Sequence, residues 1–189
     1  TQTPKKSLSG LDKSFHEVIL QLNKILDAQG LTLMPSAMHP WDDVQDIQLW
    51  PHGNKAIYNT YHRIFNCRGH GWSNLQSAHL NLPFGNEEEF VRLHNTIRLL
   101  LPLIPALAAS SPIYEGKRGA NLCNRLKFYE NNQKIVPHIT GHVIPEFIKS
   151  FEEYHQKILS PMYQSIARFE DSEILQEEWL NSRGAIARF

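Results

Sequence analysis

Residues 71–83, GWSNLQSAHLNLP, constrain the fold most, because their side chains divide into two alternating sets over the whole segment. Alternation with period two is typical of a β-strand, whose successive side chains point to opposite faces of a sheet. One set includes Ser73, Ser77, His79 and Asn81, where a strand that only fills a core would carry valine. We therefore predict a long strand with one face that bears hydroxyl, imidazole and amide groups.

Helical periodicity dominates most of the remaining sequence. Apolar residues recur at intervals of three and four, and Gly30 is placed to end the first helix. Asn86 and Ser150 are N-cap residues, and Glu89 is the capping-box partner of Asn86. The predicted helices span residues 11–29, 54–67, 87 to a bend near Pro102 and Pro105, 120–131, 151–169 with a bend at Pro161, and 173–180.

The other segments are predicted to be short strands or loops. Residues 31–38 are apolar and suit a buried strand, whereas residues 38–53 form a long irregular loop rich in Trp, Pro, Asp and His. Residues 110–119, SSPIYEGKRG, form a turn-rich loop, and residues 183–189 look like the first half of a hairpin.

Composition excludes several classes of protein. The chain has 19 Lys+Arg and 19 Asp+Glu, and this balance gives no field that would attract nucleic acid or a membrane surface. The longest apolar stretch, residues 99–109, is shorter than the roughly 20 residues of a membrane-spanning helix. The two cysteines, Cys67 and Cys123, lack disulfide or zinc-site spacing, so we expect a cytoplasmic protein in which both are structural. We expect one α+β domain over residues 1–189, with residues 1–8 flexible.

His79 and Asn81 are the first candidate site residues. Two residues apart on a strand, their side chains would point to the same side and could meet one ligand, such as a metal ion or a phosphate. The alternative is a buried histidine bonded to a neighbouring carbonyl, and the HxN pattern alone does not decide between the two.

Two further groups of residues also have two interpretations. The loop at residues 39–52, with its two tryptophans and two histidines, could form a lid or specificity pocket, or could be pinned to the core by the tryptophans. Arginine and lysine side chains near glycines and turns suit carboxylate or phosphate binding, although a single cation is more often a solvated charge. These cations are Arg68, Lys117, Arg118, Arg125, Arg183 and Arg188, with Arg125 and Arg188 favoured.

Seven strings carry a resemblance to a known family: MPSAMHPW, LWPHGNKAIY, YHRIFNCRGHGWSNLQSAHLNLPF, RLLLPLIPALAASSPIYEG, NRLKFYENNQ, GHVIPE and EEWLNSRGAIARF. Together they resemble glutamate-cysteine ligase family 2, the bacterial carboxylate-amine ligases, densely over residues 31–189. The resemblance implies a glutamine-synthetase-like catalytic fold. In that fold, helices cover one face of a curved, largely antiparallel sheet, and nucleotide, metal and amino acid meet on the other face.

The resemblance also implies roles for particular residues. His79, in SAHLNLPF, matches the strand histidine that binds a divalent ion in the superfamily, and Asn81 lies beside it. By the same similarity, Arg125 of NRL and Arg183 and Arg188 of SRGAIARF would approach substrate carboxylate or phosphate. We therefore expect Arg125 and Arg188 to be catalytic, Arg183 and Asn81 to bind cofactor, and His79 to bind metal.

The implied activity is an ATP- and Mg²⁺-dependent ligation that joins glutamate to an amine such as cysteine through an acyl phosphate. Members of the family begin with an acidic ExE strand and continue beyond the ARF strand. We therefore expect this chain to be an interior part of the catalytic domain. Unpaired sheet edges would then favour self-association into a homo-oligomer.

Two other functions fit the same residues. A histidine-liganded metal hydrolase would use His39, His52, His70 and His79 around zinc. A non-catalytic binding fragment of the ligase fold would keep the aromatic loop without turnover. Stoichiometric zinc without an effect of ATP would indicate the hydrolase, and ligand binding without product would indicate the binding fragment.

Overall fold

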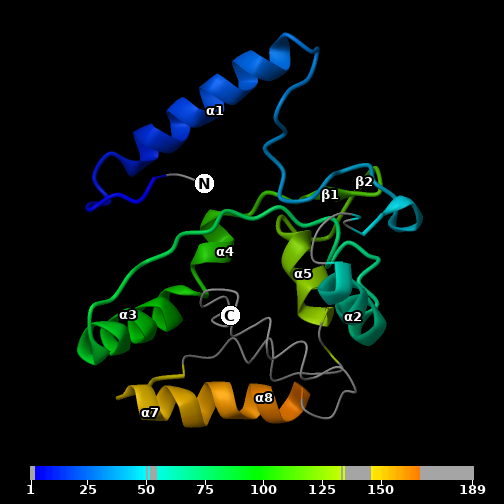
Figure 1. The fold of residues 1–189 in the computed structure, drawn as a ribbon. Helices are drawn as coiled ribbons and strands as arrows, with labels where there is room; N and C mark the ends of the chain where they lie inside the picture. The colour runs from blue at the N-terminus through cyan, green and yellow to red at the C-terminus, as the bar shows by residue number, and fades with distance from the viewer. Residues whose placement is uncertain (1–2, 50, 52–54, 133, 135–145, 167–189) are drawn as a thin grey trace. The chain divides into compact units, whose positions relative to one another are not determined.

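The computed structural model describes residues 3–49, 51, 55–132, 134 and 146–166 (Figure 1). The chain divides into two compact units, Thr1–Pro35 and Ser36–Phe189, which are described separately below. A single domain over residues 1–189 stays a prediction. Within the described ranges, no helix is long and apolar enough to cross a membrane.

The first unit consists mainly of α1 (Leu11–Asp27), which confirms the first predicted helix. Its end is a Schellman motif. Gly30 has a φ of 70°, its N–H donates to the carbonyl of Asp27 at 3.1 Å, and the N–H of Leu31 donates to the carbonyl of Leu26 at 3.0 Å. Gly30 thus ends the helix by adopting the left-handed conformation that glycine tolerates best.

The strand predicted at residues 31–38 is wrong. The segment forms no strand, and its backbone pairing in the second unit is confined to Ala37, whose N–H donates to Ser110 and whose carbonyl accepts from Gln76. Pro35 and Pro40, which lie on either side of Ala37, lack the N–H that a continuing strand ladder needs. In the described part of the long loop that follows, residues 38–49 and 51, the backbone is irregular as predicted, with one short helix, η1 (Val44–Asp46).

After η1, the second unit continues with the α-helix α2 (Lys55–Phe65), close to the predicted helix at residues 54–67. A small core lies at the end of this helix, where Ile64, Phe65 and Cys67 are buried. The ring of Trp72 packs on it, with its centroid 5.5 Å from that of Phe65. The aromatic side chain of residue 72 therefore joins α2 to the segment that follows.

The long strand predicted at residues 71–83 is also wrong. It begins as a turn, because the N–H groups of Trp72 and Ser73 both donate to the carbonyl of Gly69. Residues 75–84 form neither helix nor strand and lack a partner strand among the described residues, and the N–H of Gln76 donates to the carbonyl of Ala37 at 2.9 Å. The alternating pattern therefore predicted a strand ladder that the described structure does not contain.

A two-stranded antiparallel hairpin is the one sheet in the described part of the chain. Its strands are β1 (Ile113–Tyr114) and β2 (Lys117–Arg118), with Tyr114 opposite Lys117. The sequence predicted only a turn-rich loop here. The structure is therefore a mixed helical fold with a small antiparallel sheet, and the large curved sheet stays a prediction.

The third predicted helix is confirmed as α3 (Glu87–Leu100). Its N-cap is Asn86, whose Oδ1 accepts from the N–H of Glu89 at 2.9 Å, while the Glu89 carboxylate accepts from the N–H of Gly85 at 2.7 Å. The helix stops before Pro102, and a short helix, α4 (Ile104–Leu107), follows. The prolines thus interrupt the helix, as the pattern predicted.

The chain continues through α5 (Asn124–Asn131) to the last described helices, α7 (Phe151–Tyr154), η2 (His155–Leu159) and α8 (Ser160–Ile166). Ser150 caps α7, since its Oγ accepts from the N–H of Glu153 at 3.1 Å. Pro161, which has no N–H to donate, lies in the first turn of α8, and the π-helical turn η2 ends two residues before it. The bend predicted at Pro161 stays a prediction. The predicted helix at residues 173–180 and hairpin at 183–189 lie outside the described residues.

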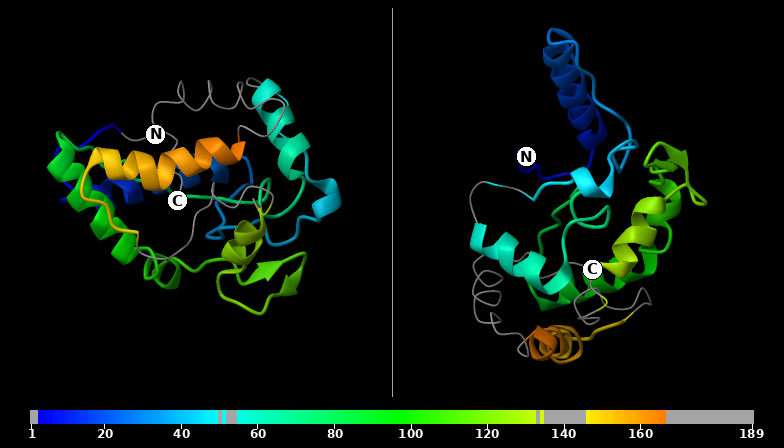
Figure 2. Two further views of the ribbon diagram at one scale, coloured as in Figure 1. Left: turned by 90° about the horizontal axis from the view of Figure 1, so that it is seen from below. Right: turned by 90° about the vertical axis from the view of Figure 1, so that its right-hand side faces the viewer.

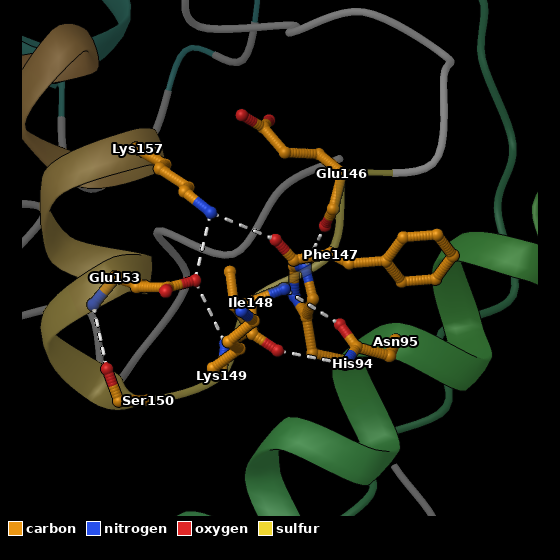
Figure 3. A network of polar contacts seen from close by, with 9 residues as sticks. All are labelled: His94, Asn95, Glu146, Phe147, Ile148, Lys149, Ser150, Glu153 and Lys157. Atoms are coloured by element: carbon orange, nitrogen blue, oxygen red, sulfur yellow. Dashed lines mark hydrogen bonds and ion pairs between the residues drawn. The ribbon is translucent and has the colours of Figure 1, made fainter.

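Helix α3 lies beside α7 in the views of Figures 1 and 2, and Figure 3 shows the hydrogen bonds between α3 and the segment directly before α7. The amide of Asn95 donates to the carbonyl of Ile148 and accepts from its N–H, both at 3.0 Å. His94 Nε2 lies 2.9 Å from the carbonyl of Glu146. The rings of Phe90 and Phe151 add an apolar contact, with centroids 5.2 Å apart.

Candidate functional site

Arg125 is held at the start of α5 by contacts from two other segments. Its backbone N–H donates to Oγ of Ser111 at 3.0 Å, and its guanidinium donates to the carbonyl of Gln76 at 2.9 Å. A guanidinium carries five N–H donors, so this bond leaves others for an anion. The residue is half-buried, and partial exclusion of water strengthens hydrogen bonds to carboxylate or phosphate relative to a fully exposed position.

Two fully buried polar residues explain the backbone conformation directly before Arg125. Ser111 is fully buried, and Asn124 donates through Nδ2 to the carbonyls of Ser111 at 2.8 Å and Asn121 at 2.6 Å. A Cβ at Gly119 would lie 2.6 Å from Cγ of Asn124, so only glycine fits there. The string GANLCNR therefore specifies a tight polar turn that aims Arg125 at the segment that contains Gln76.

His79 and Asn81 lie on the irregular segment beyond Gln76, and both are exposed. His79 is three residues from Gln76, so the two Cα atoms are at most about 11 Å apart. The structure thus brings Arg125 to the segment that carries His79 and Asn81, and their ligand-binding roles stay predictions. The other two expected arginines, Arg183 and Arg188, lie outside the described residues.

A network of hydrogen bonds around His70 and Asn74 lies next to this segment, and it was not predicted from the sequence. Nε2 of His70 lies 2.9 Å from a carboxylate oxygen of Glu115, and Nδ1 lies 3.0 Å from Nδ2 of Asn74. The same Asn74 amide pairs with the backbone of His39, accepting from its N–H at 2.7 Å and donating to its carbonyl at 3.1 Å. This network ties together three segments that are far apart in the sequence.

Aromatic rings enclose the imidazole of His70. The ring of Phe128, from α5, has its centroid 5.0 Å away, and that of Tyr114, from β1, is 6.0 Å away. Gly71 allows the backbone of α5 to come close to the segment that carries His70, because a Cβ at residue 71 would lie 2.9 Å from the carbonyl of Phe128. In the sequence, a histidine and an asparagine four residues apart around a glycine turn, HGWSN, are the signal that could have indicated the network.

The loop after residue 38 is pinned through its backbone. Besides the bonds to His39, the carbonyl of Pro40 accepts from the N–H of Gly116 at 2.8 Å. Trp41 is 66% exposed and does not pin the loop, so the interpretation of a loop held to the core by its tryptophans is wrong for this residue. Trp50 and His52 lie outside the described residues.

The described residues do not assemble a metal cluster. No group of three His, Cys, Asp or Glu residues that could hold a metal ion occurs in the described ranges. Both ring nitrogens of His70 are engaged by Asn74 and Glu115, which counts against the zinc hydrolase arrangement. Magnesium prefers carboxylate oxygens, and His79 and Asn81 provide none, so these residues alone do not complete a magnesium site.

Cys67 does not offer a reactive thiolate. Cys67 is buried in the core beside α2, and burial raises the pKa of its thiol to about 12. Its thiolate is therefore strongly disfavoured at neutral pH. This environment agrees with the structural role predicted for Cys67.

Comparison with known proteins agrees with the motifs. The sequence profile of glutamate-cysteine ligase family 2 matches residues 1–189. A protein of Archaeoglobus fulgidus, described as uncharacterized, is 45% identical over 186 residues, which are 98% of this chain and 50% of that relative. The chain thus spans about half the length of the curated relative, and no solved structure matches it. Because the profile covers the whole chain, the protein belongs to glutamate-cysteine ligase family 2.

Proposed function

We propose that this chain is part of an ATP-dependent carboxylate-amine ligase that joins glutamate to an amine such as cysteine. The observation that carries the proposal is the match of the family profile to all 189 residues. The arrangement of Arg125 beside the His79 segment supports it, because such a ligase must gather negatively charged groups at one place. The glutamine-synthetase-like fold and a cytoplasmic location belong to the same proposal.

The reaction needs activation because a carboxylate is a poor acceptor of an amine. Transfer of the γ-phosphoryl group of ATP to the γ-carboxylate of glutamate forms an acyl phosphate and ADP. The amine then attacks the acyl carbon, phosphate leaves and an amide remains. Negative charge develops on oxygen in both steps, and positioned cations are the expected means of stabilising it.

The proposed roles follow the residue chemistry. Arg125 would bind the substrate carboxylate or the transferring phosphate, and Arg188 would act with it. Arg183 and Asn81 would bind ATP, and His79 would contribute an imidazole ligand to a divalent ion. Since the described residues do not complete a magnesium site, we assign no step to the ion.

The test is ADP release from ATP and Mg²⁺ in the presence of glutamate and a panel of amino acids. We expect amine-dependent release that is lost in His79→Ala and Arg125→Ala. His16→Ala, which removes an exposed histidine on α1, is the matched control and should behave as the unchanged chain. Equal ADP release by His79→Ala and His16→Ala would contradict the role of His79. If the unchanged chain neither releases ADP nor binds ATP, the proposed function is wrong for this chain alone.

A further inference from the structure

Glu115 adopts a backbone conformation that is unfavourable for glutamate. With Gly116 it forms the two-residue turn between β1 and β2, and the two residues have φ values of 50° and 70°. Turns of this kind prefer asparagine, aspartate or glycine at the first position, and a left-handed residue with a Cβ costs about 1–2 kcal/mol. In this position the carboxylate reaches Nε2 of His70, whose side chain is 1% exposed. The contact with His70 therefore explains a residue that turn preference does not.

The hydrogen bonds around Asn74 fix both its amide orientation and the His70 tautomer. Because the N–H of His39 needs an acceptor, the oxygen of the Asn74 amide must face it, and the NH₂ group then faces Nδ1 of His70. Nδ1 must therefore accept, so the ring proton lies on Nε2 and is donated to Glu115. The result is one directed chain of hydrogen bonds from Asn74 through His70 to Glu115.

These hydrogen bonds determine the position of the backbone segment that contacts Arg125. The Asn74 amide pairs with both backbone groups of His39, as a neighbouring strand would. Two residues further on, the N–H of Gln76 donates to Ala37, and the carbonyl of Gln76 accepts from Arg125. The segment that leads to His79 is thus held on one side by Asn74 and on the other by Arg125.

We propose that His70 and Asn74 are positioning residues of the ligase site, which hold the Gln76 backbone in place for Arg125 and His79. The assignment of the site rests on the proposed function, whereas the link from His70 to Gln76 rests on the geometry alone. Neither residue needs to touch substrate. Loss of the Asn74–His70 bond should loosen Gln76 and with it the relative placement of the two candidate ligand-binding side chains.

A matched pair of variants tests the link. In His70→Asn, an amide oxygen can take the place of Nδ1 and accept from Asn74, whereas in His70→Gln an amide N–H can take the place of Nε2 and reach Glu115. We expect amide hydrogen exchange at Gln76 to rise about tenfold in His70→Gln and to stay near the wild-type rate in His70→Asn. Equal exchange at Gln76 in all three proteins would overturn the link.

The tautomer of the unchanged protein keeps the proposal testable if the variants fail to fold. Nitrogen-15 chemical shifts of the His70 ring should show a proton on Nε2 and none on Nδ1. A ring protonated on Nδ1, alone or in addition to Nε2, would contradict the directed chain.

Binding of ATP with Mn²⁺ as the metal probe then tests the positioning role. We expect about tenfold weaker binding in His70→Gln and recovery in His70→Asn, as for other residues that orient a ligand through a neighbour. If His70→Gln loosens Gln76 and binds ATP and Mn²⁺ as tightly as wild type, the positioning role is wrong. If the wild-type protein does not bind ATP and Mn²⁺ at all, both the proposed function of this chain and the positioning role are wrong. Amide hydrogen exchange at Gln76 then still decides whether His70 and Asn74 hold the backbone.

Discussion

Around Asn74, buried amides and an imidazole fasten one irregular segment to the next, whereas around α3 and α7 capped helices are joined by aromatic rings together with the side chains of His94 and Asn95. We call the first the amide-linked region (residues 36–40, 70–76 and 111–125) and the second the helical region (α3 with residues 146–166). Buried polar residues of the amide-linked region include His70, Asn74, Ser111 and Asn124. Ring contacts of the helical region include Phe90 with Phe151 and Tyr154.

The difference indicates where function lies. Buried polar groups cost stability unless every partner is present, but once satisfied they specify one geometry. Aromatic packing and helix caps stabilise a fold with less dependence on exact placement. A region that must hold an arginine and a histidine relative to one another is expected to use satisfied polar contacts. The amide-linked region does so at Arg125.

The largest expected effect of a substitution is at Asn74. Asn74→Ala would leave two backbone groups of His39 and Nδ1 of His70 without their partner, which should lower the free energy of unfolding by about 3 kcal/mol. Asn95→Ala in the helical region is the matched control, because it also removes an amide that pairs with backbone, yet from a less buried position. Urea unfolding should show a clearly smaller loss for Asn95→Ala. Equal losses would remove the contrast between the two regions.

Gly119→Ala tests the packing of the turn before Arg125. The added Cβ would meet the Asn124 amide, which is fixed by its bonds to Ser111 and Asn121. We expect a loss of about 2 kcal/mol in the free energy of unfolding. The control is Gly69→Ala, where a Cβ meets nothing within 4 Å. A neutral Gly119→Ala would mean that the turn can rearrange.

Asn86→Ala measures what a single cap contributes to the helical region. It removes the acceptor for the N–H of Glu89, and the expected loss is about 1 kcal/mol. Asn86→Ser, which can cap in the same way, should retain most of the stability. Thermal unfolding followed by circular dichroism would detect the difference, and identical midpoints for alanine and serine would show that the cap does not matter.

The smallest expected effect is a pH dependence that arises from His94. Burial lowers the pKa of His94 below its ordinary value of 6.5, mainly by disfavouring the charged ring. The unfolded chain therefore binds a proton more readily, so stability should fall as pH drops below 6.5 and level off below the folded pKa. His94→Gln should reduce this slope in urea titrations between pH 8 and pH 5, and an unchanged slope would assign it to other groups.

Helices were predictable from the sequence because their signals are local. Asn86 and Ser150 as caps and Gly30 as a stop each depend on a few neighbouring residues. Strand pairing depends on a partner elsewhere in the chain, and residues 71–83 show the consequence, since the alternating pattern could not reveal that the Asn74 side chain replaces part of a ladder. The hairpin at Glu115 was missed because glutamate is an unusual turn residue.

The candidate site was predictable only in part. Arg125 was singled out among the candidate cations and by its place in the NRL motif of the family, and the structure gives it a defined partner in Gln76. His70 and Asn74 were hidden because their importance comes from a three-way contact among distant segments. No local pattern records such a contact, although glycine at position 71 is a trace of the close packing around it.

The most direct test of the site is to follow backbone amide resonances while ATP, Mg²⁺ and glutamate are added to the whole chain. We expect shifts concentrated at residues 76–81 and 111–125 in the amide-linked region and its extension, with the amides of α3 unchanged. Binding that shifts α3 and leaves residues 76–81 and 111–125 unperturbed would contradict the assignment of the site.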